Sequence, residues 1–564
     1  MRNSVILAAA VAAVIATTTT AVLAGCSPSP VAHVHAGGVG DRPASVGLPT
    51  GANLGTGPRE SAGPVGKRPG SPAVSTGRST GATAGSAAGT RRPARPPAEP
   101  VKSLPCARPS TDWNEVVASR RPAVEGYTSI DSAVPGTDVG LYISATAARY
   151  RIQAYRMGYY GHAQACLVWT SAWQAGRVQQ RVKVVGATNT PTAPWSKSMT
   201  MATKGWDPGV YLLRIDGGSR TARTFMPLVM RSPSFAGRTV LVMPDTTWQA
   251  YNSWGGYSLY DGPRHSFKNR SRAVPFDRPY DARTGAADLI PYELPFVALA
   301  EKIGIPLGYA SDVDLQRFPT AFLRAHAIIS VGHDEYYSPT MRETLTTARD
   351  HGVNLAFFGG NDVYRKIRFA NTANGADRLE INYKDATDPI KTPSLVTTQW
   401  RETPSNNPES SLTGADYRCA SSVYYPMVVA DPTNWLFTGT GVQAGTKLPG
   451  VVGQEFDGIN IARPVPRPLT VLFHSPVICT HRPTSQDSTY YTTPSGAGVL
   501  DIGAYYWNCA IARRCPAKID GATSDIVTRI TTNFLTAAAA GPLGKRHPAV
   551  DNVRTYYPRP RVGN

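Results

Sequence analysis

Apolar and polar residues alternate in several short segments of residues 106–235. Each segment is bounded by Gly, Pro, Asp or Thr, and a period of two places its apolar side chains on one face of an extended chain. The clearest examples are Val139–Ser144, Tyr150–Tyr155, Gln180–Val185 and Val210–Ile215. Short strands at this spacing predict an antiparallel β-sandwich.

The pattern changes after residue 236, where continuous apolar runs replace the alternation. Such runs are typical of strands that are buried on both faces of a sheet. The runs are Thr239–Met243, Ala327–Val331 and Val353–Phe358, followed much later by a strand at Leu469–Phe473.

Helices are predicted between and after these strands. Residues 292–303 are amphipathic, and residues 339–351 form a second helix with Ser338 as its N-cap and Pro339 at its first position. A closing helix is expected at 525–538. Because each helix returns the chain to the same end of the sheet, alternating strands and helices predict a parallel, doubly wound α/β sheet.

The first 105 residues lack both patterns. Arg2 precedes an uncharged run of small and apolar residues that ends at Leu23-Ala24-Gly25-Cys26, which is typical of a lipoprotein signal. A plain signal peptide that contains a cysteine is the alternative. Residues 27–105 are dominated by Gly, Pro, Ala and Ser without any aromatic residue, so we expect a disordered stalk.

This leader predicts a protein held on the extracellular face of the cell membrane by a lipid on Cys26. No other stretch is long and apolar enough to span a bilayer. The expected organisation is a signal peptide at 1–26, a stalk at 27–105, a β-sandwich at 106–235, an α/β domain at 236–545 and a tail at 546–564.

The formal net charge of +19 does not indicate a nucleic-acid binder. The stalk alone holds nine Lys/Arg against three Asp/Glu, and the basic residues that follow it are scattered rather than grouped in a stripe. An exported protein also meets no nucleic acid. We therefore expect the charge to favour an anionic cell envelope.

Six cysteines follow Cys26, and an even number in an exported chain predicts three disulfides. Many pairings are open, and proximity along the sequence favours Cys106–Cys166, Cys419–Cys479 and Cys509–Cys515. A zinc site is the alternative, but the chain has no C-x-x-C pair or Cys/His cluster with the spacing that zinc needs.

Polar loops follow the three buried strands, at Pro244–Asp261, Gly332–Tyr337 and Gly359–Tyr364. Because ligands of open α/β sheets bind beyond the carboxyl ends of the strands, these loops predict one shared site. Each piece also has a simpler interpretation. His333, Asp334 or Glu335 could cap the next helix, the tyrosines could pack in the core, and Asn361 could serve a turn.

Five motifs in and around these loops carry a resemblance to a known family. They are Trp248–Asn252, Ser258–Asp261, Gly332–Glu335, Phe357–Asn361 and Gly496–Asp501. Together they resemble the large-subunit domain of N,N-dimethylformamidase over about residues 237–540, and Tyr155–Tyr160 resembles part of a domain found beside it. The resemblance implies a glutamine-amidotransferase-like α/β fold without the cysteine nucleophile of that fold.

The resemblance also implies a mononuclear ferric iron held by two tyrosines and one glutamate. Carried over by motif, these ligands are Tyr251, Tyr260 and Glu335. Only nine positions separate the two tyrosines, so Tyr257 and Tyr280 remain spare candidates. The polar residues that the resemblance places around the iron are His333, Asn361, Lys384 and Glu455.

Such a site indicates hydrolysis of a C–N amide bond. The metal would polarise the carbonyl and activate water, Glu455 or His333 would carry the proton, and Asn361 and Lys384 would stabilise the oxyanion. We expect a small-molecule or cell-envelope amide as substrate, and a homo-oligomer or a small partner subunit is left open. The alternatives are a non-catalytic surface protein that binds glycans, or the same fold with another reaction, such as hydrolysis of a sugar derivative.

Overall fold

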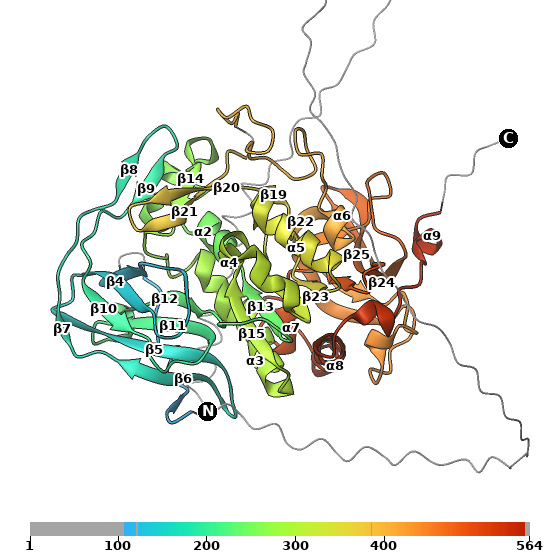
Figure 1. The fold of residues 1–564 in the computed structure, drawn as a ribbon, viewed down its shortest axis with the longest axis horizontal. Helices are drawn as coiled ribbons and strands as arrows, with labels where there is room; N and C mark the ends of the chain where they lie inside the picture. Colours follow the sequence, from blue (N-terminus) through green and yellow to red (C-terminus); the bar gives the residue numbers. More distant parts are fainter. Residues whose placement is uncertain (1–105, 120–121, 385, 559–564) are drawn as a thin grey trace, which may run out of the picture. The chain divides into compact units, whose positions relative to one another are not determined.

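The computed structural model describes residues 106–119, 122–384 and 386–558 (Figure 1). The predicted signal peptide, Cys26 and the predicted stalk lie outside the described residues. Within them the protein is a mixed α/β protein with many strands in several sheets and few helices. The predicted α/β class is confirmed at this level.

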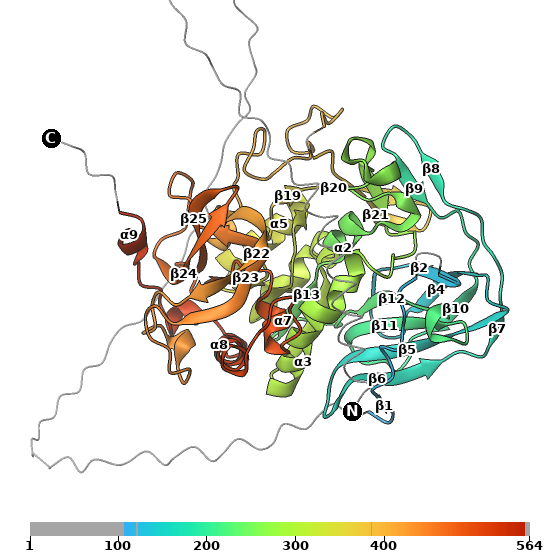
Figure 2. The same ribbon diagram turned by 180° about the vertical axis from the view of Figure 1, so that it is seen from behind.

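Two sheets form the core of the N-terminal part of the described chain. In the larger one, the antiparallel neighbours β5 (Arg149–Tyr160) and β11 (Gly209–Asp216) are central. Its other strands are β1 (Pro109–Ser110), β3 (Ser132–Ala133), β6 (Ala163–Thr170), β7 (Gln174–Ala175) and β12 (Arg223–Met230). The smaller antiparallel sheet, seen from behind in Figure 2, holds β2 (Val124–Thr128), β4 (Asp138–Ala145) and β10 (Met199–Ala202). Apolar side chains from both sheets form one buried cluster, as their alternation predicts.

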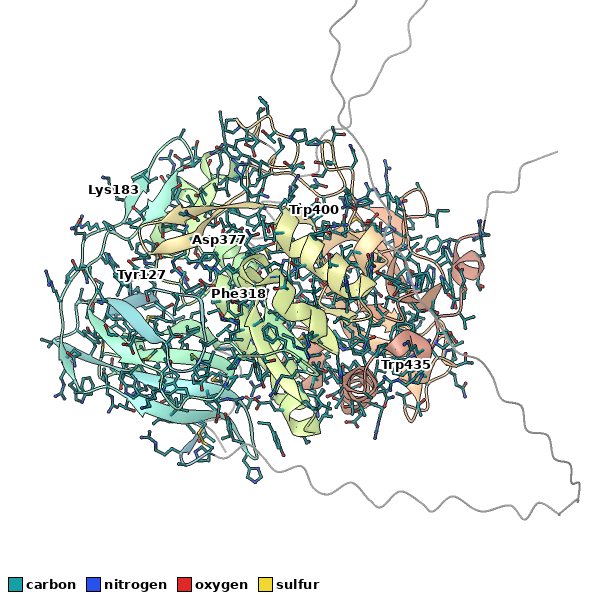
Figure 3. All side chains as sticks on the ribbon, in the orientation of Figure 1. Tyr127, Lys183, Phe318, Asp377, Trp400 and Trp435 are labelled. Carbon is teal, nitrogen blue, oxygen red and sulfur yellow. A yellow bond between two sulfur atoms is a disulfide. The ribbon has the colours of Figure 1, made fainter. Side chains whose placement is uncertain are left out.

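The segment at 180–185 departs from the prediction. Its strand β8 is limited to Lys183–Val185 and pairs with β9 (Thr190–Thr192) in a separate two-stranded sheet. Lys183 lies at the outer edge of the view in Figure 3, and Val184 is 38% exposed. The alternation here therefore does not mark a strand of the two larger sheets, although Val182 packs against a small buried cluster.

A seven-stranded sheet organises the rest of the chain. Its order is β15 (Leu307–Ser311), β13 (Thr239–Met243), β16 (Ala327–Val331), β18 (Asn354–Phe358), β26 (Gly498–Asp501), β25 (Arg482–Thr492) and β24 (Leu469–Cys479). The first five strands are parallel, and β25 and β24 join by antiparallel pairing. The three predicted buried strands β13, β16 and β18 are confirmed, and every residue in them is buried.

Helices connect the parallel strands and flank the sheet. They are α2 (Asp245–Tyr251), α3 (Leu294–Ile303), α4 (Asp312–Arg317), α5 (Pro339–Asp350), α6 (Ser410–Thr413), α7 (Trp507–Ile511), α8 (Gly521–Ala539) and α9 (Val553–Tyr556). Ser338 caps α5 as predicted, because its hydroxyl accepts the N–H of Met341 at 3.1 Å. The helix predicted at 292–303 begins as α3 at Leu294, after a π-helical turn at Leu289–Glu293 that includes its first two predicted residues. Pro295, the second residue of α3, has no N–H to donate to this turn.

Smaller sheets carry further residues of the site described below. They pair β22 (Asp416–Val428) with β23 (Lys447–Gly458), β17 (Tyr336–Tyr337) with β19 (Arg365–Lys366), and β21 (Gly375–Ile381) with both β14 (Ala273–Pro275) and β20 (Arg368–Thr372). The three predicted disulfides are all confirmed: Cys106–Cys166, Cys419–Cys479 and Cys509–Cys515. Among the helices of the described ranges, none has the length and apolar character to cross a membrane.

Buried ion pairs join the N-terminal sheets to the α/β part. Arg156 of β5 pairs with Glu301 of α3 at 2.8 Å. Asp131 pairs with both Arg317 of α4 (2.9 Å) and Arg378 of β21 (3.0 Å). Removing one partner of such a pair leaves a buried charge without compensation, so the two parts depend on each other.

Candidate metal centre

Tyr251 and Tyr260 are brought together by a compact turn at the carboxyl end of β13. Helix α2 ends at Tyr251, and the chain then returns so that the N–H of Leu259 donates to the carbonyl oxygen of Ala250 at 2.9 Å. The hydroxyl of Ser258 accepts the N–H of Tyr260 at 3.0 Å and fixes this turn. The short spacing between the two tyrosines therefore places both phenols at one point.

Glu335 reaches the same point from the carboxyl end of β16. Gly332 has a φ of 88°, and a Cβ there would meet Glu293 at 2.6 Å, so the turn after β16 requires glycine. The N–H of Glu335 donates to the hydroxyl of Thr247 (2.9 Å), and its carbonyl oxygen accepts the N–H of Arg365 (2.8 Å). These bonds tie the glutamate to α2 and to β19.

The oxygen atoms of these three side chains form a triangle with nearly equal sides. The Tyr251 hydroxyl lies 2.9 Å from Oε2 of Glu335, the Tyr260 hydroxyl lies 2.8 Å from the same atom, and the two hydroxyls are 2.8 Å apart. The two rings stack with their centroids 4.4 Å apart. Glu335 is buried, whereas both tyrosines are partly exposed. The structure thus brings together the three oxygen donors predicted from the sequence.

The electrostatic surroundings favour an ionised glutamate beside two neutral phenols. Burial opposes the ionisation of Glu335, but the positive charges of Lys384 and His333 outweigh it and lower its pKa to about 2. Loss of water around the two phenol groups, together with the carboxylate of Glu335, raises the pKa values of Tyr251 and Tyr260 well above the ordinary value. In the absence of a cation, both phenols therefore keep their protons at neutral pH.

His333 and Glu455 form a second side of the site. Oε2 of Glu455, in β23, lies 3.3 Å from Nε2 of His333 and accepts a hydrogen bond from Nδ2 of Asn361 at 3.0 Å. Nδ1 of His333 lies 2.8 Å from the carbonyl oxygen of Gly360, and Nε2 lies 3.4 Å from the Tyr251 hydroxyl. A carbonyl oxygen only accepts, so Nδ1 carries a hydrogen and Nε2 faces the site.

The charges of this second side follow from its burial. Burial alone would lower the pKa of His333, but the carboxylates of Glu455 and Glu335 outweigh it and raise the pKa to about 10. The imidazole is therefore protonated at neutral pH. Burial raises the pKa of Glu455 above its ordinary value, although His333 opposes that rise.

Lys384 joins the site through Tyr336, a residue that the sequence reasoning missed. Nζ of Lys384 donates to the Tyr336 hydroxyl at 2.5 Å, and this hydroxyl donates to the Tyr260 hydroxyl at 2.6 Å. Nζ also lies 3.6 Å from the centroid of the Tyr260 ring, which is a cation–π contact. The one sequence signal that could have identified Tyr336 is that it directly follows Glu335.

All seven predicted site residues are therefore close to one another, and the spare tyrosines have other surroundings. The backbone carbonyl oxygen of Tyr257 accepts a hydrogen bond from Nη1 of Arg278 at 2.8 Å. Tyr280 lines a small cavity together with Asp245 and Arg378. The contacts of the described residues thus favour Tyr251 and Tyr260 over Tyr257 and Tyr280.

A family model described as N,N-dimethylformamidase beta subunit-like, C-terminal, matches residues 151–520, which is more than half of the chain. The chain belongs to this family. The resemblance predicted from the five motifs is confirmed, and the motifs and the seven site residues all lie within the matched range. The match to the N,N-dimethylformamidase beta subunit-like family begins inside β5. A search of curated proteins finds no match.

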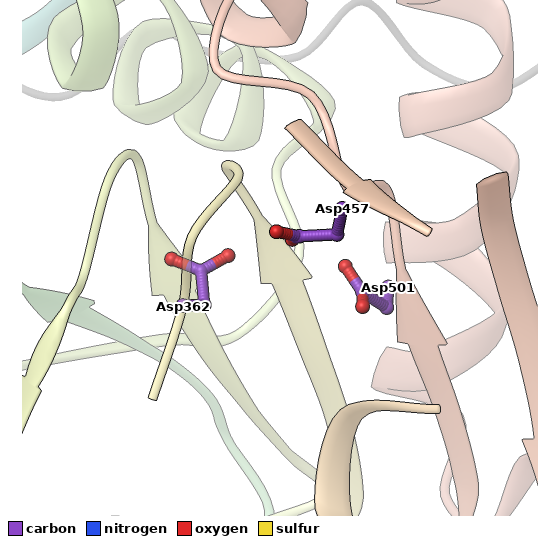
Figure 4. Close-up of side chains that lie close together, drawn as sticks. All are labelled: Asp362, Asp457 and Asp501. Atoms are coloured by element: carbon purple, nitrogen blue, oxygen red, sulfur yellow. The ribbon is translucent and has the colours of Figure 1, made fainter. Parts of the chain in front are cut away.

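This N,N-dimethylformamidase-like chain has a further group of carboxyl groups beside the site, which the sequence reasoning missed. Oxygen atoms of Asp362, Asp457 and Asp501 lie within 4.8 Å of one another, and Figure 4 shows that they come from three separate segments. Burial raises the pKa of Asp457 to about 7 and raises those of Asp362 and Asp501 well above the ordinary value. We call this group the aspartate cluster.

Hydrogen bonds link the aspartate cluster to the backbone of the site. Asp457 accepts the N–H of Asn361 at 2.8 Å, and Asp362 accepts the N–H of Asp334, which lies between His333 and Glu335, also at 2.8 Å. One oxygen of Asp362 and one of Asp501 have no hydrogen-bond partner among the described residues. The cluster thus holds two of the site loops, and its oxygens are also of a type that binds hard cations.

Proposed function

We propose that the chain is a metal-dependent hydrolase of a C–N amide bond, with a mononuclear ferric ion held by Tyr251, Tyr260 and Glu335. The observation that carries this proposal is the triangle of their oxygen atoms. We also propose the finer architecture, a β-sandwich followed by a glutamine-amidotransferase-like domain. Attachment to the extracellular face of the cell membrane through a lipid on Cys26 is part of the same proposal.

The spacing and the chemistry of the triangle support a small, hard cation. Three oxygens with sides of 2.8 to 2.9 Å match one face of an octahedron. The centre of such an octahedron lies about 2.0 Å from each corner, which is the usual distance between oxygen and a small hard cation. Phenolate and carboxylate are hard donors, and three protein ligands leave other positions open for water and substrate.

The surrounding residues support an acid and a base with separate tasks. A bound ferric ion would supply Lewis acidity toward an amide carbonyl and a water molecule. Glu455 accepts the proton of the attacking water, with its Oε2 held by Asn361. His333 is protonated at neutral pH and donates a proton to the leaving amine. Lys384 is hydrogen-bonded to Tyr336 and in this arrangement supports Tyr260 rather than an oxyanion.

The products of this reaction are a carboxylate and an amine. We propose a small-molecule or cell-envelope amide as the substrate, because an exported enzyme meets the envelope first. The family is described by the beta subunit of N,N-dimethylformamidase, so we also propose that the chain associates with another subunit or with its own copies.

Elemental analysis of the purified protein tests the metal assignment. We expect about one iron per chain and a visible tyrosinate-to-iron absorption band, and the loss of both in Glu335→Gln. Asp501→Asn is the matched control, because it alters a buried carboxyl group of the aspartate cluster without touching the triangle. Iron that is lost in Asp501→Asn but kept in Glu335→Gln would move the metal to the aspartate cluster. Wild-type protein that stays colourless and metal-free after reconstitution would refute the proposal.

A further inference from the structure

We propose that Tyr336 is a positioning residue of the candidate metal centre, which holds the phenol oxygen of Tyr260 and connects it to the ammonium group of Lys384. This inference deepens the proposed function and rests on it. It makes the two tyrosine ligands chemically unequal, because the Tyr336 hydroxyl donates a hydrogen bond to Tyr260, whereas Tyr336 meets Tyr251 through an edge contact of the two rings.

The surroundings of Tyr336 leave its side chain little freedom. The residue is fully buried, in strand β17, which pairs in parallel with β19. The hydroxyl of Thr246 donates to its carbonyl oxygen at 2.9 Å. Its ring packs in a small apolar cluster with Ala250, Leu259, Val274 and Ile367, against which Tyr251 and Tyr260 also pack. The Tyr336 hydroxyl is therefore presented to the site by the core rather than by a loop.

The direction of the hydrogen bonds follows from the chemistry of the donors. An ammonium group has no lone pair, so in the 2.5 Å contact Lys384 must donate and the Tyr336 oxygen must accept. The single O–H of Tyr336 then remains for the 2.6 Å contact, in which the Tyr260 oxygen accepts. The chain of donors thus runs from Lys384 through Tyr336 to Tyr260. A donor that is itself polarised by a cation forms a stronger hydrogen bond.

Tyr251 has different neighbours on its oxygen atom. Nε2 of His333 lies 3.4 Å from it, which is a longer and weaker contact than that of Tyr336 with Tyr260. When both phenols are ligands, Tyr260 keeps a short hydrogen bond from Tyr336. This bond withdraws electron density from the Tyr260 oxygen, and it fixes the orientation of that oxygen toward Glu335, as outer-shell partners of metal ligands do.

Replacing Tyr336 by phenylalanine removes the hydrogen bond and keeps the ring. With the full chain loaded with iron, we expect the tyrosinate-to-iron band of Tyr336→Phe to move to longer wavelength, because a phenolate without a donor gives up charge more easily. We also expect the dissociation constant for iron to rise by about 10- to 100-fold. Lys384→Met, which removes the other end of the donor chain, should move the band in the same direction.

Tyr337→Phe is the matched control. Tyr337 is the next residue of β17 and is fully buried, but its hydroxyl donates to Oδ2 of Asp334 at 2.5 Å and its ring packs in a different cluster. Its band should stay at the wild-type position. Tyr336→Phe and Lys384→Met proteins that keep the wild-type band and iron affinity would overturn the inference and leave the proposed function intact. A wild type without iron or band would overturn both. If Tyr336→Phe does not fold, the Lys384→Met band decides between these outcomes.

Discussion

Metal binding should release two protons from this chain, one from Tyr251 and one from Tyr260. The pKa values of both phenols lie well above the ordinary value in the metal-free site, so both are protonated near neutral pH. The pKa of Glu335 is about 2, so this ligand is already ionised and contributes no proton. A ligand must lose its proton before it binds, so the apparent affinity should fall as the pH falls.

The expected size of this effect follows from the number of phenols. Each proton released changes the affinity by a factor of about 10 per pH unit, or about 1.4 kcal/mol. Two phenols predict a change of about 100-fold per pH unit, or about 2.7 kcal/mol. Tyr251→Phe and Tyr260→Phe should each reduce the dependence to about 10-fold per pH unit, provided that the remaining phenol still binds.

Competition with a chelator of known affinity at each pH, between about pH 6 and pH 8, measures this slope. Tyr257→Phe is the control, because Tyr257 is not one of the three triangle residues and its contact with Arg278 uses the backbone carbonyl oxygen, which phenylalanine keeps. This variant should keep the wild-type slope. A wild-type affinity that does not change with pH would refute phenol ligation. A slope that is unchanged in both Tyr251→Phe and Tyr260→Phe would show that other groups supply the protons.

Three further predictions concern the stability and the local geometry of the site. In the metal-free protein, the His333 pKa of about 10 means that His333 stabilises the fold fully below pH 6.5 and loses this effect as the pH rises through about 10. Urea unfolding should therefore show a fall on the order of a few kcal/mol over that window in wild type but not in His333→Gln. Replacing Cys419 and Cys479 by serine opens a 60-residue loop and should lower the free energy of unfolding by about 4 kcal/mol, which a denaturant titration would detect. Gly285→Ala would place a Cβ 2.2 Å from the carbonyl oxygen of Trp248 in α2, so iron affinity in the chelator assay should fall by about 10-fold or more, whereas Gly161→Ala, at an open turn with a similar φ, should keep it.

The elements whose side chains face a core on every side were the easiest to predict. Strands β13 and β16 have the predicted bounds, because a continuous apolar run is stable only where both faces of the strand are buried. The strand predicted at 180–185 was too long, because alternation shows only that a strand would be amphipathic. It does not show that a core lies on the apolar side, and Val184 is exposed. The π-helical turn before α3 was not predicted, because a periodic pattern of apolar residues does not distinguish a π-helical turn from the first turn of an α-helix.

The site could be predicted as far as its residues belong to motifs at strand ends. Tyr251, Tyr260 and Glu335 follow buried strands, and the topology of the parallel sheet brings such positions together. Tyr336 was missed because nothing in the sequence shows whether the hydroxyl of the residue after Glu335 points toward the candidate metal centre or into the core. The aspartate cluster was missed for a related reason. Its members are 139 positions apart along the chain at the extremes. The pairing of β18 with β26 brings Asp362 near Asp501, and the bridge between Phe456 and Ala504 adds Asp457.

The ion pairs of Arg156 and Asp131 have a practical consequence for anyone who would dissect this protein. The hydrophobic pattern changes near residue 235, which would be an obvious place to divide the chain into two fragments. Glu301 and Arg317 would then lie on one fragment and their counter-ions on the other. Opening a buried pair costs about 3–5 kcal/mol, a large share of what holds a domain folded. Neither half should therefore fold well alone, and a fusion protein that uses the candidate metal centre would have to include the amino-terminal sheets.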